Sequence, residues 1–159
     1  MCKANRKPKI IVFDLDYTLW PFWVDTHVTP PFKKKGSDIV DSHGQTIRYY
    51  KEVPEVLKHL SEEGYELGVA SRTSEIQGAK QLLHLFNWDR YFKYKEIYPG
   101  SKVTHFSKIQ KASGVDYKDM VFFDDEHRNI ADVGKLGVTC IFVQNGVTLA
   151  FVENALKNF

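Results

Sequence analysis

Two carboxylates follow an apolar run near the start of the chain. Asp14 and Asp16 stand two residues apart, directly after the sequence KIIVF. A buried carboxylate without a partner is costly, so we expect the pair to face water, a cation or a reacting group. One carboxylate can act as a nucleophile, and a second beside it can donate and accept protons. Taken alone, such a pair suits a helix cap or a turn equally well.

Three further polar groups follow apolar runs or open helices later in the chain. Ser71 ends the run ELGVAS, and a hydroxyl followed by backbone N–H groups can hold a phosphate oxygen. Lys102 opens a segment with helical spacing, where its charge opposes the helix dipole unless an anion lies near. The acids Asp124, Asp125 and Glu126 follow the run MVFF, and their mutual repulsion favours a cation among them or a helix N-terminus.

Alternating strands and helices are needed to bring these residues together. Apolar, β-branched runs predict strands at residues 9–14, 66–71, 95–98, 119–124 and 139–143. Apolar residues at helical spacing predict helices at 54–63, 74–86, 102–113, 128–136 and 147–156, and Ser74 to Gln77 has the pattern of a capping box. This order predicts an α/β fold, a three-layer, Rossmann-like parallel sheet with helices on both faces. The acid pair, the hydroxyl, the lysine and the second acid pair would then meet at the carboxyl ends of the strands, where such folds bind ligands.

Residues 20–52 interrupt this alternation. They contain three prolines and the lysine run at 33–35, and then residues typical of strands on both sides of His43-Gly44. We therefore predict a small β-hairpin flap that hangs over the carboxyl end of the first strand. The lysine run is either a solvated loop or a patch that steers anionic substrates. Neither this segment nor residues 72–101 has room for a large cap domain, so we expect one domain over residues 1–159.

Composition excludes several classes of protein. The formal net charge is +2, with 22 basic against 20 acidic residues, which is too even to indicate nucleic-acid binding. No apolar run approaches the ~18 residues of a membrane helix, and the four apolar residues before Asp14 are too few for a signal peptide. The two cysteines, Cys2 and Cys140, form no CxxC pattern, so a reducing, cytoplasmic location is expected. The oligomeric state stays open, with a monomer favoured.

The order of these groups resembles the four motifs of the haloacid dehalogenase superfamily of phosphatases, over roughly residues 8–158. The motifs here are Asp14-Leu15-Asp16-Tyr17-Thr18, Ser71, Lys102 and Asp124-Asp125. The resemblance implies a HAD-like fold and a phosphatase that forms an aspartyl-phosphate on Asp14, with Asp16 as general acid and base. It also implies Mg²⁺ held by Asp14, by the backbone carbonyl of Asp16 and by Asp125, with Asp124 supporting the site and Thr18 bracing the turn.

The same resemblance implies how a substrate is held. Ser71, Arg72 and Lys102, with the backbone N–H groups of Leu15 and Asp16, would hold the phosphate, and Trp23 would contact the rest of the substrate. An open site of this kind would accept a phosphorylated small molecule or a phosphoprotein. Protein phosphotyrosine and sugar phosphates such as fructosamine-6-phosphate are both implied, and the residues do not choose between them.

Three other functions fit these residues less well. A dehalogenase on the same scaffold would keep Asp14 but would not need an acid at position 16. A receiver-like signalling domain also uses acids, a hydroxyl, a lysine and magnesium, but its phospho-accepting Asp follows the third strand, where this chain has Tyr98-Pro99-Gly100. A phosphate-binding module without turnover is disfavoured because the charged residues at the motif positions are all present.

Overall fold

The computed structural model describes residues 6–159, so Cys2 lies outside the described part. Five parallel strands form one sheet in the order β5-β4-β1-β6-β7. Their bounds are Phe92–Ile97 for β5, Glu66–Ser71 for β4, Ile10–Phe13 for β1, Met120–Asp124 for β6 and Thr139–Phe142 for β7. The expected parallel α/β architecture is therefore confirmed, and β1 lies at its centre between β4 and β6.

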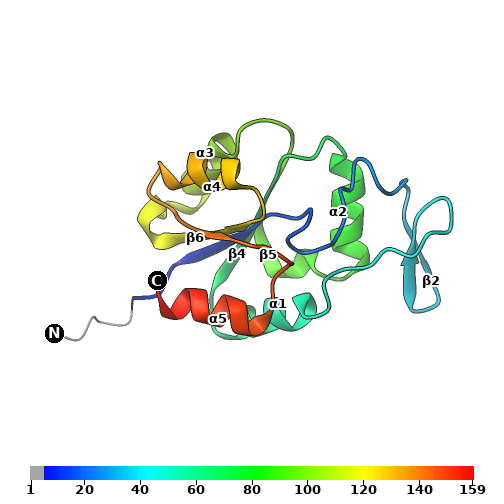
Figure 1. Cartoon of the computed structure of the whole chain (residues 1–159), viewed down its shortest axis with the longest axis horizontal. Coiled ribbons are helices and arrows are strands. Elements are labelled where there is room, and N and C mark those ends of the chain that lie inside the picture. Colours follow the sequence, from blue (N-terminus) through cyan, green and yellow to red (C-terminus); the bar gives the residue numbers. More distant parts are fainter. Residues whose placement is uncertain (1–5) are drawn as a thin grey trace.

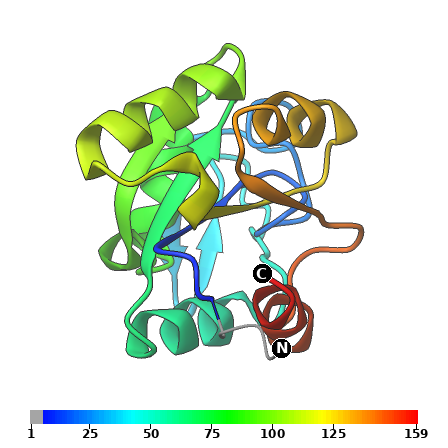
Figure 2. The same ribbon diagram turned by 90° about the vertical axis from the view of Figure 1, so that its left-hand side faces the viewer.

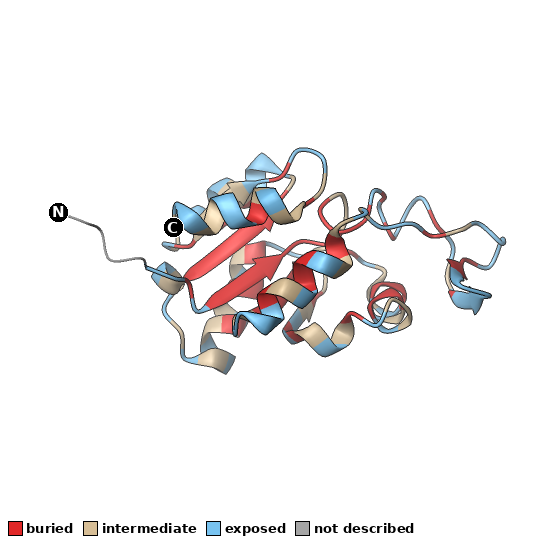
Figure 3. Ribbon diagram, turned by 90° about the horizontal axis from the view of Figure 1, so that it is seen from below, coloured by how far each residue is buried: buried red, intermediate tan, exposed pale blue. Residues whose placement is uncertain are grey.

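Within residues 6–159, five α-helices cover the two faces of the sheet. They are α1 (Val53–Glu62), α2 (Ile76–Leu85), α3 (Lys102–Ser113), α4 (His127–Gly134) and α5 (Leu149–Lys157). Figure 2 shows α3 and α4 on one side of the sheet and α1 and α5 on the other. Because β1 has helices on both faces, all four of its side chains are buried, and Figure 3 shows buried strands at the centre of the sheet.

Local sequence explains where the helices begin and end. The Ser101 side chain caps α3 by accepting from the N–H of Val103, and Gly114 ends that helix in the left-handed conformation that glycine adopts at little cost. The expected capping box of α2 is wrong. Glu75 is the cap, and its carboxylate accepts from the N–H of Gly78, since the helix begins at Ile76 rather than Ser74.

The long connection from β1 to α1 pairs antiparallel around His43-Gly44, as the sequence predicted, through a bridge between Val40 and Thr46, and it contains a second hairpin that the sequence did not predict. Lys33–Lys35 (β2) pairs antiparallel with Asp38–Val40 (β3), so the lysine run is a strand rather than a loop. Where the sequence predicted the hairpin turn, the Asp41 carboxylate organises a compact turn by accepting from the N–H groups of Thr29, His43 and Gln45.

The β2–β3 hairpin does not lie over the carboxyl end of β1, where the sequence predicted a flap. The N–H of Phe32 donates to Gln81 of α2 at 2.6 Å, and the hairpin forms a groove with Leu85 and Phe86 at the far end of that helix. Figure 1 shows it beyond α2, at the opposite end of the molecule from the carboxyl terminus. The anchoring of Phe32 to α2 therefore leads the hairpin away from the carboxyl end of β1. Among the described residues, no helix is long and apolar enough to cross a membrane.

Candidate active site

An open cleft of about 410 Å³ lies at the carboxyl ends of the strands. The order of the sheet explains its composition, because β1 ends between β4 and β6, and the loop after β5 leads into α3. The cleft brings together residues from all these elements and from the segment after β1. Its lining residues are Asp14, Asp16, Trp23, Asp25, Thr26, Ser71, Arg72, Thr73, Lys102, Glu126, Arg128 and Asn129.

Lys102 joins two of the acids. Its side chain is 1% exposed, and its Nζ lies 2.7 Å from Asp14 Oδ1 and 2.7 Å from Asp124 Oδ2. Burial alone would lower the pKa of Lys102, but the charges of Asp14 and then Asp124 outweigh it and raise the pKa. The ammonium group is therefore charged, and it holds one oxygen of Asp14 in a fixed position. Thr18 Oγ1 donates to the other oxygen, Asp14 Oδ2, at 3.3 Å.

Asp14, Asp124 and Asp125 form a cluster in which one oxygen of each lies within 4.8 Å of the others. Both carboxylate oxygens of Asp124 already accept hydrogen bonds from the protein. Lys102 and the amide of Asn129 donate to Oδ2, and the N–H of Glu126 donates to Oδ1. Asp125 instead faces Asp14, and burial, reinforced by Asp14, raises its pKa to about 9. Closely placed, incompletely neutralised carboxylate oxygens suit a hard divalent cation such as Mg²⁺.

Asp16 lies in a tight loop that follows β1. Its Oδ1 accepts from the indole N–H of Trp20 at 2.8 Å and from the N–H of Val24 at 3.1 Å. Burial raises the pKa of Asp16 to about 7, with a smaller contribution from Asp14, although the bond from Trp20 lowers it. A left-handed Tyr17, with φ of 58°, lets the chain turn back so that Trp20 reaches Asp16.

The last residue of β4 and the residues that follow it form the wall facing α4. Ser71 is buried, and its Oγ accepts from the N–H of Thr73 at 3.3 Å. The guanidinium of Arg72 donates to the side-chain oxygen of Asn129 at 3.3 Å. Asn129 thus connects Arg72 with Asp124. This role was not predicted from the sequence, where the only signal is that Asn129 stands three residues after the acid run.

Trp23 forms the rim of the cleft and is 47% exposed. Its indole stacks on His27 at 5.1 Å, and Tyr17 packs edge-on against the indole. The backbone N–H of Trp23 donates to His27 Nδ1 at 2.9 Å. His27 was not among the residues predicted from the sequence. The side chain of Leu15 is fully buried in the core, so only the backbone of this residue can meet a ligand.

Comparisons with known proteins point to one family. A family model described as acid phosphatase matches residues 6–159. Human magnesium-dependent phosphatase 1 is 59% identical over 155 residues, covering 97% of this chain and 88% of that protein. A HAD-like hydrolase superfamily protein of Schizosaccharomyces pombe is 45% identical over 169 residues, covering 97% of this chain and 98% of that one. The N-terminal part of a Bacteroides fragilis protein, a phosphatase domain complexed with Mg, has a similar fold, with a TM-score of 0.65 and 17% identity over 96% of this chain and 40% of that one.

Proposed function

Because the chain belongs to the acid phosphatase family of HAD-like hydrolases, we propose that it is a magnesium-dependent phosphatase that hydrolyses phosphate monoesters through an aspartyl-phosphate on Asp14. One observation carries this proposal furthest. A carboxylate held by Lys102 and Thr18 lines the same cleft as a second carboxyl group, Asp16, whose pKa is raised to about 7. This is the pairing that a nucleophile and a proton donor require.

In the first step, an oxygen of Asp14 attacks phosphorus while the bond from phosphorus to the leaving oxygen breaks. Asp16, in its protonated form, gives its proton to that leaving oxygen. In the second step, Asp16 takes a proton from water as the water oxygen attacks phosphorus. The acyl-phosphate bond then breaks, which releases inorganic phosphate and restores Asp14. A pKa of about 7 suits both transfers near neutral pH.

The acid cluster accounts for the need for magnesium. We propose that an oxygen of Asp14, the carbonyl of Asp16 and a carboxylate oxygen of Asp125 hold Mg²⁺, while Asp124 keeps Lys102 and Asn129 in place. Bound Mg²⁺ would offset the repulsion between the carboxylates and the phosphate and stabilise the charge on the transferred group. Asp125 fits this role because it faces Asp14, whereas Asp124 already accepts from Lys102, Asn129 and the N–H of Glu126.

The remaining cleft residues would bind the phosphate. Ser71, the free donors of Arg72, and Lys102 line the wall beside Asp14, and the N–H groups of Leu15 and Asp16 follow the nucleophile in the chain. Such fixed donors stabilise the charge on phosphoryl oxygens without reorganising during the reaction.

The rim of the cleft supports a proposal for the substrate. No residue of the hairpin lines the cleft, so a bulky leaving group meets mainly Trp23 and its neighbours. We propose that the enzyme acts on phosphotyrosine in proteins or on sugar phosphates such as fructosamine-6-phosphate, since an exposed indole packs against either type of ring.

Hydrolysis of a chromogenic aryl phosphate, with Mg²⁺ and then with excess chelator, tests the proposal. Release of phosphate should require Mg²⁺ and should be abolished in Asp14→Asn, which keeps the size of the side chain but lacks the nucleophilic charge. Asp25→Asn removes another acid of the same cleft and should retain activity, which makes it the matched control. Full activity of Asp14→Asn, or release that persists in chelator, would refute the mechanism.

A further inference from the structure

His105 is a fully buried titratable residue that the mechanism above does not use. It lies on α3, one turn after Lys102. Its Nε2 lies 2.8 Å from the carbonyl oxygen of Ser71 and 2.8 Å from that of Tyr98. Its Nδ1 lies 3.1 Å from the carbonyl oxygen of Ser101. One ring therefore contacts the end of β4, the loop after β5 and the cap of α3.

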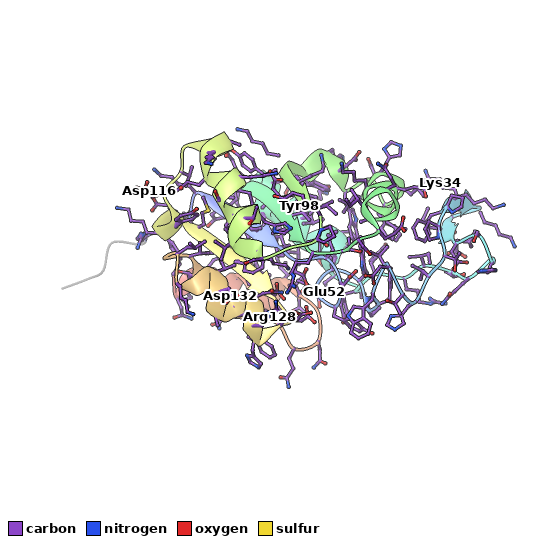
Figure 4. The ribbon with its side chains drawn as sticks, turned by 90° about the horizontal axis from the view of Figure 1, so that it is seen from above. Lys34, Glu52, Tyr98, Asp116, Arg128 and Asp132 are labelled. Carbon is purple, nitrogen blue, oxygen red and sulfur yellow. The ribbon has the colours of Figure 1, made fainter. Side chains whose placement is uncertain are left out.

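The ring contacts arise where the β4–β5 ladder ends. The N–H of Tyr98 donates to the Ser71 carbonyl at 3.1 Å, just beyond the last paired residues of the two strands. The imidazole of His105 stacks on the Tyr98 ring at 4.2 Å, and Lys108 lies over the same ring at 4.6 Å. Figure 4 shows Tyr98 beside α3. The His105 imidazole thus packs and hydrogen-bonds α3 against the ends of β4 and β5.

The protonation of the ring follows from its surroundings. Burial lowers the pKa of His105 and outweighs the hydrogen bonds to the three carbonyls, which raise it, while the charge of Lys102 makes a smaller contribution that also lowers it. The ring is therefore neutral and carries one proton. A proton on Nδ1 would leave the Nε2 lone pair against two carbonyl oxygens. A proton on Nε2 satisfies both of these acceptors with one shared donor, at the shorter distances. We therefore assign the proton to Nε2.

We propose that His105 is a positioning residue that fixes Ser71 and Lys102 relative to each other, by donating from Nε2 to the carbonyls of Ser71 and Tyr98. The proposal rests on the proposed function only in that both residues bind phosphate. Ser71 belongs to β4 and Lys102 to α3, and no hydrogen bond between their own side chains holds them together among those of the described residues. The His105 ring supplies that link. Without its donor, the first turn of α3 can move against the strand end, and the phosphate-binding groups lose their spacing.

Two variants separate the donor from the ring. His105→Phe keeps an aromatic ring against Tyr98 but lacks the donor, whereas His105→Gln lacks the ring but can place an amide N–H near the position of Nε2. We expect His105→Phe to weaken binding of inorganic phosphate, with Mg²⁺ present, and to lower kcat/KM, each about tenfold. His105→Gln should recover most of both losses. His84→Phe is the matched control, since that side chain is 77% exposed, and it should match the natural protein.

Circular dichroism of each variant first establishes that it is folded. The proposal is overturned if folded His105→Phe binds phosphate as the natural protein does, or if folded His105→Gln is as impaired as His105→Phe. Nitrogen-15 NMR of the His105 ring in the natural protein is an independent test that needs no variant. It should show the proton on Nε2, and a proton on Nδ1 alone would overturn the proposal even if both variants fail to fold. Phosphate binding and the ring proton are both measured without turnover, so their outcome is separate from that of the proposed function.

Discussion

Replacing Trp20 with Phe tests whether Asp16 is the acid and base of the reaction. The variant removes the donor of the 2.8 Å hydrogen bond from Nε1 to Asp16 Oδ1. This bond favours the ionised carboxylate and offsets part of the effect of burial, so its loss should raise the pKa of Asp16 above its value of about 7. A hydrogen bond to an ionised group contributes about 1.5–3 kcal/mol, so Asp16 should hold its proton roughly tenfold to a hundredfold more tightly.

The assay is the pH dependence of kcat for an aryl phosphate at saturating Mg²⁺. Asp16 must be protonated to give a proton to the leaving oxygen, so activity falls as the pH rises through the pKa of Asp16. In Trp20→Phe this fall should occur at higher pH. Trp88→Phe is the control, because Trp88 stacks on Trp20 at 6.4 Å, whereas the hydrogen bonds to Asp16 come from Trp20 and Val24. An alkaline limb that does not move in Trp20→Phe, or that moves equally in Trp88→Phe, would refute the reasoning.

Two further predictions concern the acid cluster. Asp125→Asn should raise the Mg²⁺ concentration needed for half-maximal turnover far more than Asp124→Asn does, because Asp124 is already bonded to Lys102 and Asn129; a metal titration giving the opposite order would mean that the two roles are reversed. Burial raises the pKa of Asp125 from 3.8 to about 9 in the folded state, so the folded protein binds this proton more tightly than the unfolded chain. The metal-free protein should therefore lose thermal stability as the pH rises from 3.8 to about 9. Calorimetry should show this slope, and saturating Mg²⁺ or Asp125→Asn should flatten it; a slope that neither affects has another origin.

The strands and helices that carry the site could be predicted because local patterns decide them. Glu66–Ser71 and Lys102–Ser113 have in the structure the bounds that the sequence indicated. The first is an apolar run, and the second begins after a serine cap and ends before Gly114. Since the carboxyl ends of neighbouring parallel strands meet at one edge of a sheet, the same patterns placed the acids, Ser71 and Lys102 together. The candidates Arg72 and Trp23 came only from the resemblance to a family.

The β2–β3 hairpin and the roles of Asn129 and His105 could not be predicted in this way, because they depend on contacts between different parts of the chain. Lys33–Lys35 lacks the alternation of apolar and polar residues that marks a strand, and it is one because it pairs with β3, where Ile39 and Val40 are buried. Asn129 contacts Arg72 across 57 positions, and His105 contacts Ser71 across 34. No pattern within a short window of sequence contains such pairs.

The contact between Trp20 and Asp16 also gives the protein an internal optical probe. The indole is fully buried between Phe22 at 5.5 Å and Trp88 at 6.4 Å, and its N–H points at the carboxylate. Indole emission responds to the local electric field, and that field changes when the bonded carboxylate becomes a neutral acid. With the other two tryptophans, Trp23 and Trp88, replaced by Phe, the remaining fluorescence would report the proton on Asp16 in real time, without any added dye.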